Sequence, residues 1–82
     1  MKMIDNVITT VAVTAGIPAG ELNSGTVLYG SGIVSSLMML EIMSAIEKEY
    51  DIFIRPEELI EENFATIGTL SQFIGTKMNL TQ

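Results

Sequence analysis

The sequence predicts a small all-α protein, a four-helix bundle with a long loop between the first two helices and a short third helix. Three observations predict it. Apolar residues recur at three- and four-residue spacing, glycine and proline gather between these periodic segments, and 48% of the 82 residues are hydrophobic. A chain this short has room for one core, so we expect a single domain over residues 1–82.

The first helix is expected from Lys2 to Ala15. Its buried face would consist of Ile4, Val7, Ile8, Val11 and Ala15. The β-branched residues between positions 7 and 14 would also suit a strand, but the apolar positions do not alternate as they would in one. Gly16 stands where a glycine commonly ends a helix.

Residues 17–34 are expected to form a long loop, because proline, glycine, asparagine and serine are scattered through them. Four apolar residues would anchor it: Leu22, Val27, Leu28 and Tyr29. Loops of this length are unusual in small domains and often carry function.

The second helix is expected from Ser36 to about Tyr50, with Ser35 as its N-cap. Its apolar stripe would consist of Met39, Ile42, Met43, Ile46 and Tyr50.

Two further helices are expected. A proline followed by carboxylates is typical of a helix start, which predicts a short third helix from Pro56 to Glu62. The fourth would begin near Thr66 and end before Gly75, leaving residues 76–82 as a frayed tail. Its inward residues would be Ile67, Leu70, Phe73 and Ile74.

The net charge of −6 argues against nucleic acid or anionic lipid as the main partner, since both require a basic face. Asp5 and Glu21 are the only acidic residues outside positions 41–62, so the charge gathers in one stretch. No segment is long and apolar enough to span a membrane, and the first residues do not resemble a signal peptide. We expect a cytoplasmic monomer.

The sequence offers little catalytic chemistry. It contains no histidine and no cysteine, which removes the usual general base and the commonest metal ligands. We therefore expect that the protein is not an enzyme and holds no metal.

The segment from Gly30 to Leu37 places a serine pair at a helix start. Free backbone N–H groups and the helix dipole favour an anion there, so a phosphodiester on Ser36 would be stabilised. A plainer interpretation is that Ser35 is a cap and Ser36 a neutral first-turn residue. The segment taken alone favours the plainer interpretation.

The run from Thr26 to Ile74 resembles the acyl carrier protein family. The resemblance rests on four stretches: Gly32-Ile33-Val34-Ser35-Ser36-Leu37, Leu40-Glu41-Ile42 through Ala45-Ile46-Glu47-Lys48-Glu49-Tyr50-Asp51-Ile52, Pro56-Glu57-Glu58-Leu59 and Glu62-Asn63-Phe64-Ala65-Thr66-Ile67. It implies an acyl-carrier-like bundle in which Ser36 carries a covalent 4′-phosphopantetheine arm. Ser35 takes the place of the aspartate in the family's Asp-Ser-Leu motif, which preserves a cap but not the charge.

The resemblance also implies what the arm and its surroundings do. The thiol of the arm would hold acyl or aminoacyl groups as thioesters for fatty-acid, polyketide or related biosynthesis. The residues Gly-Ile-Val before the serine pair resemble stand-alone carriers of specialised pathways. The bundle interior would part to shelter the acyl chain, with a lining that includes Ile42, Ile46, Leu59 and Ile67.

Partners are implied as well. They are a phosphopantetheinyl transferase and acyl-transferring and acyl-modifying enzymes with basic docking patches. Leu37, Leu40, Glu41 and Glu47 would form the docking face of this chain.

Two other functions are weighed against the carrier. An unmodified, carrier-like acidic interaction module would bind proteins without an arm, and the serine at position 35 is its support. A small enzyme built on Glu57 and Glu61 is disfavoured, because carboxylates one turn apart on a short helix ordinarily form a solvated face.

Overall fold

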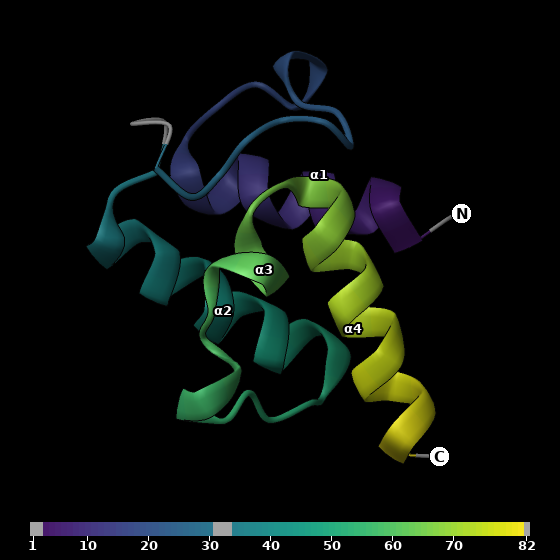
Figure 1. Ribbon diagram of the computed structural model, residues 1–82. Helices are drawn as coiled ribbons and strands as arrows, with labels where there is room; N and C mark the ends of the chain where they lie inside the picture. The colour runs from purple at the N-terminus through teal and green to yellow at the C-terminus, as the bar shows by residue number, and fades with distance from the viewer. Residues whose placement is uncertain (1–2, 31–33, 82) are drawn as a thin grey trace.

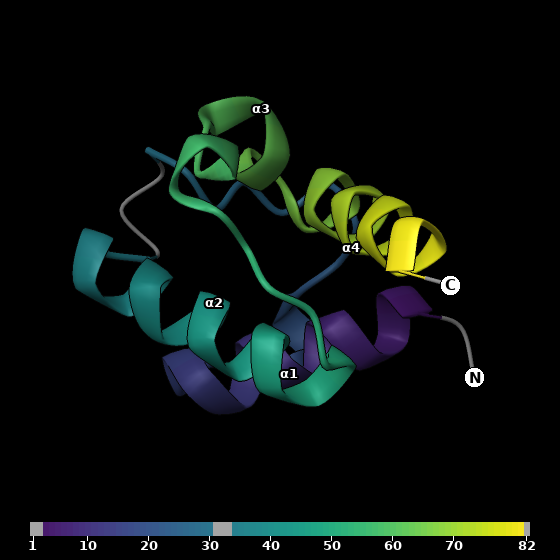
Figure 2. The ribbon, with the colours of Figure 1, turned by 90° about the horizontal axis from the view of Figure 1, so that it is seen from below.

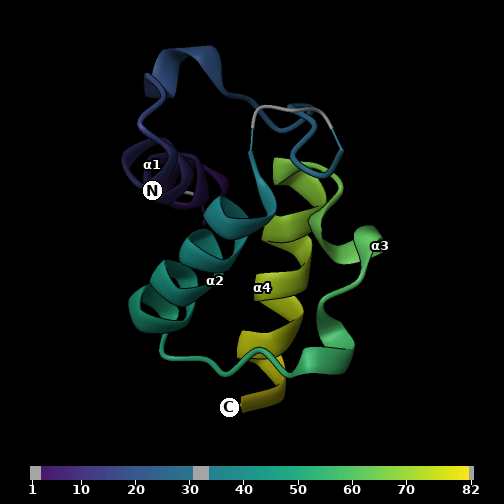
Figure 3. The same ribbon diagram turned by 90° about the vertical axis from the view of Figure 1, so that its left-hand side faces the viewer.

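The computed structural model describes residues 3–30 and 34–81 and confirms the all-α class. The described residues form α1 (Met3–Ala15), α2 (Ser36–Tyr50), α3 (Glu61–Phe64) and α4 (Ile67–Thr81), with 3₁₀ turns η1 (Ala19–Glu21) and η2 (Pro56–Glu58). Helix α1 packs against both α2 and α4, and α3 packs against α4 (Figure 1). In two further views α1 and α3 lie on opposite sides of the bundle (Figures 2 and 3).

Helix α1 is amphipathic as predicted, except that Ala12 is buried and Ala15 is only half-buried. Val7 and Val11 are completely buried in the core. Gly16 ends the helix with a positive φ of 71°, and the Ile17 N–H donates to the Ala12 carbonyl at 3.0 Å. This bond satisfies one of the free carbonyls at the helix end, so the prediction for Gly16 is confirmed. Lys2, the predicted first residue, lies outside the described residues.

The long connection between α1 and α2 is fastened to the start of α4. The Leu28 N–H donates to the Ala65 carbonyl at 2.8 Å, and the Ile67 N–H donates to the Thr26 carbonyl at 3.1 Å. These bonds flank an antiparallel bridge between Val27 and Thr66. The connection is therefore held by backbone pairing as well as by apolar side chains.

A close approach reinforces this fastening. The Gly68 N–H donates to the Ser24 carbonyl at 2.8 Å. A Cβ at position 68 would lie 3.0 Å from that carbonyl oxygen, so a side chain there would push the loop away.

Two of the four predicted loop anchors are wrong. Leu22 and Leu28 are buried, but Val27 is 46% exposed and Tyr29 is 54% exposed. Successive side chains of an extended segment point to opposite faces, so burial of Leu28 turns its two neighbours outward.

Helix α2 has the predicted bounds. Ile42 and Ile46 are fully buried, Met43 is nearly so, and Met39 and Tyr50 pack partly buried against the core. After Tyr50 the chain turns at Asp51, which has a positive φ of 53°.

The predicted third helix, Pro56 to Glu62, is wrong as a single element. The turn η2 begins at Pro56 as expected but ends at Glu58, and α3 begins only at Glu61. Between them Ile60 is extended. The Glu58 carbonyl accepts a hydrogen bond from the Asn63 side chain at 2.8 Å, so a side-chain amide takes the place of the next backbone helical bond.

Helix α4 begins where predicted but extends further. The Thr66 hydroxyl accepts from the Thr69 N–H at 3.1 Å, which caps the helix. The predicted end before Gly75 is wrong, because helical backbone continues to Thr81. Met3 of α1 lies beside Gly75, and Lys77 pairs with Glu58, so this last part of the helix has tertiary partners. Gln82 lies outside the described residues.

The Lys77 ammonium lies 2.8 Å from Glu58 Oε1, which also accepts from the Arg55 N–H at 2.9 Å. These two hydrogen bonds, the one from Lys77 first, hold the pKa of Glu58 below its usual value.

Glu58 is predicted to make stability depend on pH. A carboxyl whose pKa is lower in the folded chain contributes stability above its unfolded-state pKa, and that contribution is lost as the pH falls through its folded-state pKa. At pH 7, Glu58→Gln should lower the free energy of unfolding by about 1 kcal/mol. This difference from the native chain should shrink as the pH falls below the ordinary value of 4.5.

Urea unfolding at pH 7 and pH 3 measures the difference. The matched control is Glu57→Gln, which changes an exposed carboxyl of the same turn and should stay within about 0.5 kcal/mol of the native chain. An equal loss for Glu58→Gln at both pH values would contradict the role of its charge.

Candidate functional site

The start of α2 is organised by Ser35. Its hydroxyl accepts a hydrogen bond from the Met38 N–H at 3.1 Å, and its carbonyl accepts from the Met39 N–H at 2.9 Å. Its backbone is extended, as is usual for an N-cap. The predicted cap is confirmed, and it makes Ser36 the first residue of the helix.

The environment of Ser36 suits an attached phosphodiester. By helix geometry the N–H groups of Ser36 and Leu37 have no acceptor within α2, and the positive end of the helix dipole lies there. The first turn of α2 carries no acidic side chain that would repel an anion. The side chain of Ser36 and residues 31–33, which include Gly32 and Ile33 of the motif, lie outside what the structure describes.

Three of the predicted docking residues lie together on α2. Leu37 is 69% exposed, Leu40 is 54% exposed, and Glu41 is exposed as well. Their spacing of three and four residues places them on one face of the helix. We call Leu37, Leu40 and Glu41 the α2 face.

Glu47 is placed differently. It is only partly exposed, and its Oε2 accepts a hydrogen bond from the Ile54 N–H at 2.8 Å. The carboxylate therefore holds the chain that follows α2. No sequence pattern indicates this hydrogen bond. It forms only because the turn at Asp51 brings Ile54 back beside Glu47.

An apolar cavity of about 510 Å³ lies beside the start of α2. Its lining includes Ser35, the residue before Ser36, and Leu59 from the segment between η2 and α3. The other lining residues are Leu28, Tyr29, Gly30, Val34, Met39, Leu40 and Met43. The cavity therefore opens next to the predicted attachment site.

Of the residues that the resemblance implied for the interior, Leu59 lines this cavity, whereas Ile42, Ile46 and Ile67 lie fully buried in the bundle interior. Whether that interior parts around an acyl chain stays a prediction. Leu28 and Val34 were missed. The apolar residues on either side of Gly30 could have indicated this, since a loop that is anchored at both ends by apolar residues can line a cavity.

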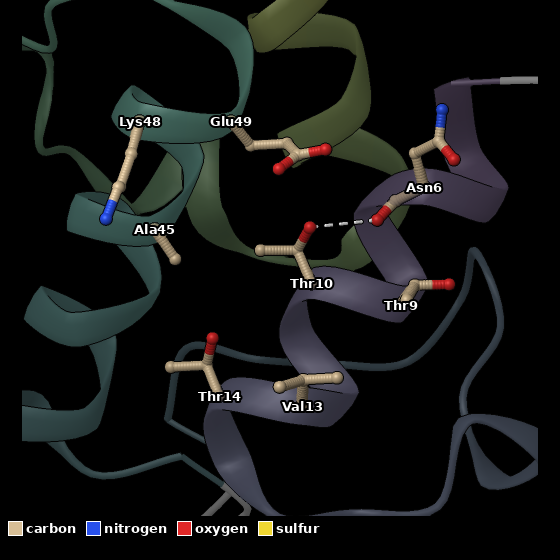
Figure 4. A pocket seen from close by; sticks show the side chains of 8 residues that line it. All are labelled: Asn6, Thr9, Thr10, Val13, Thr14, Ala45, Lys48 and Glu49. Atoms are coloured by element: carbon tan, nitrogen blue, oxygen red, sulfur yellow. Dashed lines mark hydrogen bonds between the residues drawn. The ribbon is translucent and has the colours of Figure 1, made fainter.

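A second cavity, of about 580 Å³, lies between α1 and α2 and is shown in Figure 4. Most of its lining residues have polar side chains, and the Thr10 hydroxyl within it donates to the Asn6 carbonyl at 3.0 Å. None of the predicted site residues contributes to it. The candidate site is therefore at the other cavity.

Residues 3–30 and 34–81 contain no group of three or more acidic side chains placed to hold a metal ion. In the same part of the chain, no helix has the length and apolarity needed to cross a membrane.

Removing the cap is predicted to destabilise α2. Ser35→Ala leaves the Met38 N–H without its acceptor and should lower the free energy of unfolding by about 1 kcal/mol. Ser44→Ala is the control, because Ser44 is exposed in the interior of the same helix and alanine favours helix there. Thermal unfolding compares the two, and equal midpoints would contradict the capping role.

Comparison with known proteins identifies the family. A family described as the phosphopantetheine attachment site matches residues 5–74, which is most of the chain. In the comparison with curated proteins, no protein matches this chain. This chain belongs to the phosphopantetheine attachment family, an acyl carrier protein-like group of carriers to which 4′-phosphopantetheine is covalently attached.

Proposed function

We propose that the chain is a discrete acyl carrier protein, a single domain over residues 1–82, and that Ser36 carries the arm. The observation that carries the proposal is the cap at Ser35, which makes Ser36 the first residue of α2 inside the region matched by the family. Leu37 follows directly, as in the family's motif. The apolar cavity beside Ser35 supports the same assignment.

The chain would contribute attachment and orientation. When bound, the arm supplies a thiol that can hold an acyl or aminoacyl group as a thioester. The Ser36 hydroxyl would provide the oxygen of attachment, and the helix N–H groups would stabilise the phosphodiester. The sequence has no histidine to deprotonate that hydroxyl, so a partner transferase would do so, and the carrier itself would not be an enzyme.

We propose the α2 face as the docking surface for this transferase and for acyl-transferring and acyl-modifying enzymes. Leu37 and Leu40 would contact apolar residues of the partner, while Glu41 would meet one of its basic patches. The Glu47 carboxylate is bonded to the Ile54 N–H, so a docking role for it stays a prediction. With no acidic residue in the first turn of α2, apolar contact would dominate near Ser36.

The cavity beside Ser35 would take the acyl group. Its volume of about 510 Å³ is within the range of small-molecule sites, and most of its lining is apolar. Fatty-acid, polyketide and related biosynthesis all supply acyl groups with an apolar chain that such a cavity could hold. Cytoplasmic location and a monomeric state stay predictions.

The unmodified interaction module is the second candidate. One observation favours it: where the family's motif has an aspartate, the neutral Ser35 leaves the start of α2 without an acidic side chain. A transferase that requires that charge would leave Ser36 bare.

The attachment site can be tested by intact mass. After incubation with coenzyme A and a broad-specificity phosphopantetheinyl transferase, the native chain should gain one phosphopantetheine. Ser36→Ala should gain none, because the attachment oxygen is missing. Ser35→Ala is the matched control and should still be modified. Modification of Ser36→Ala would refute the site, and an unmodified native chain would favour the interaction module.

The docking surface can be tested by transferase kinetics. Leu37→Ala removes an exposed apolar contact and should raise KM about tenfold, which corresponds to about 1.4 kcal/mol. Val13→Ala truncates a side chain of α1 that is 77% exposed and should leave KM unchanged. Equal KM values for the two variants would contradict docking on the α2 face.

A further inference from the structure

Leu59 contributes to the wall of the cavity and belongs to a segment that hydrogen bonds from both α2 and α4 hold in place. At its start, the Ile54 N–H donates to Glu47 of α2 at 2.8 Å. Further along, Glu58 of η2 accepts from Lys77 of α4, also at 2.8 Å. The segment from residue 54 to residue 60 therefore spans between two helices, with one carboxylate at each tie.

Leu59 is the residue that this segment places against α2. It lines the cavity of about 510 Å³ and also a smaller one of about 160 Å³, which it shares with Leu40, Met43 and Ile54. Leu59 is 42% exposed and lies in neither η2 nor α3. Core packing restrains only the buried part of the Leu59 side chain. Its position therefore also depends on the hydrogen bonds that hold the preceding residue, Glu58.

Lys77 holds the Glu58 carboxylate to α4, while Asn63 of α3 bonds only the Glu58 backbone carbonyl. The Lys77 side chain is 12% exposed and that of Glu58 is 20% exposed, so water screens the pair weakly. Arg55 lies 3.8 Å from the same carboxylate, but it is 60% exposed and belongs to the same turn. It cannot hold η2 against α4, whereas Lys77 does.

We infer that Lys77 is a positioning residue: through Glu58 it limits how far Leu59 can move from α2, and so it limits the length of the acyl group that the cavity accepts. This inference rests on the proposed carrier function. It assigns selectivity to a residue of α4 that does not line the cavity itself. Loss of the tie would let the wall move and would shift the preference to longer acyl groups.

The test uses Lys77→Met, which keeps an unbranched side chain but removes the ammonium. Lys48→Met removes the same charge from an exposed position of α2 and is the matched control. Each protein is loaded from butyryl-, octanoyl- and dodecanoyl-coenzyme A by a broad-specificity transferase. The measured quantity is the Tm of each acylated form minus the Tm of the unacylated holo form.

The native chain and Lys48→Met should share one length of greatest gain in Tm, and Lys77→Met should shift that maximum to a longer acyl group. Lys77→Arg keeps a donor to Glu58 and should restore the native maximum. If Lys77→Met lowered the Tm of the holo form and of every acylated form by the same amount, the Lys77–Glu58 pair would stabilise the fold without affecting acyl length. This result would overturn the inference. A native gain that does not vary with length would overturn it too.

Failure of loading is a separate outcome, because it would refute the carrier function while the tie can still be measured in the unmodified protein. The Leu59 N–H donates to the Pro56 carbonyl at 3.1 Å, so its hydrogen exchange reports opening of η2, the turn that the Lys77–Glu58 pair holds to α4. Exchange should be about tenfold faster in Lys77→Met than in Lys48→Met. Equal rates would overturn the positioning role.

Discussion

The arrangement of the site depends on the backbone hydrogen bonds that fasten the α1–α2 connection to the start of α4. They join residues 24–28 to residues 65–68 and place Leu28 in the core. Because Leu28 is also part of the apolar cavity, the same fastening builds one wall of that cavity. A loop that looks irregular in sequence therefore forms part of the frame of the cavity that Ser35 also lines.

The acidic stretch of the chain has two different roles. Glu41 is exposed beside the apolar residues of the α2 face and can meet a partner. Glu47 and Glu58 instead accept hydrogen bonds within the molecule and fasten the segment between α2 and α3. This division matters because a carboxylate that already bonds a backbone N–H or an ammonium is less available to a basic patch. The first turn of α2 carries no acidic side chain, so it is more apolar than the net charge of −6 suggests.

Local patterns predicted the elements that local interactions create. Gly16 and Ser35 mark helix ends whose bonds lie within a few residues, and both predictions were confirmed. The errors concern interactions that periodicity does not encode. The Asn63 side-chain amide bonds the Glu58 carbonyl and interrupts the third helix, while the Lys77–Glu58 pair, 19 residues apart, gives the later part of α4 a tertiary contact. The motif indicated Ser36, but only the folded chain shows which residues form the cavity beside it.

The central claim is that Ser36 carries phosphopantetheine in the organism that makes this protein. The most direct measurement is fragmentation mass spectrometry of the peptide containing Ser35 and Ser36, from protein purified from its native cells without added transferase. The account predicts one phosphopantetheine, located on Ser36 and absent from Ser35. A peptide bare at both serines, or a group located on another residue, would contradict it.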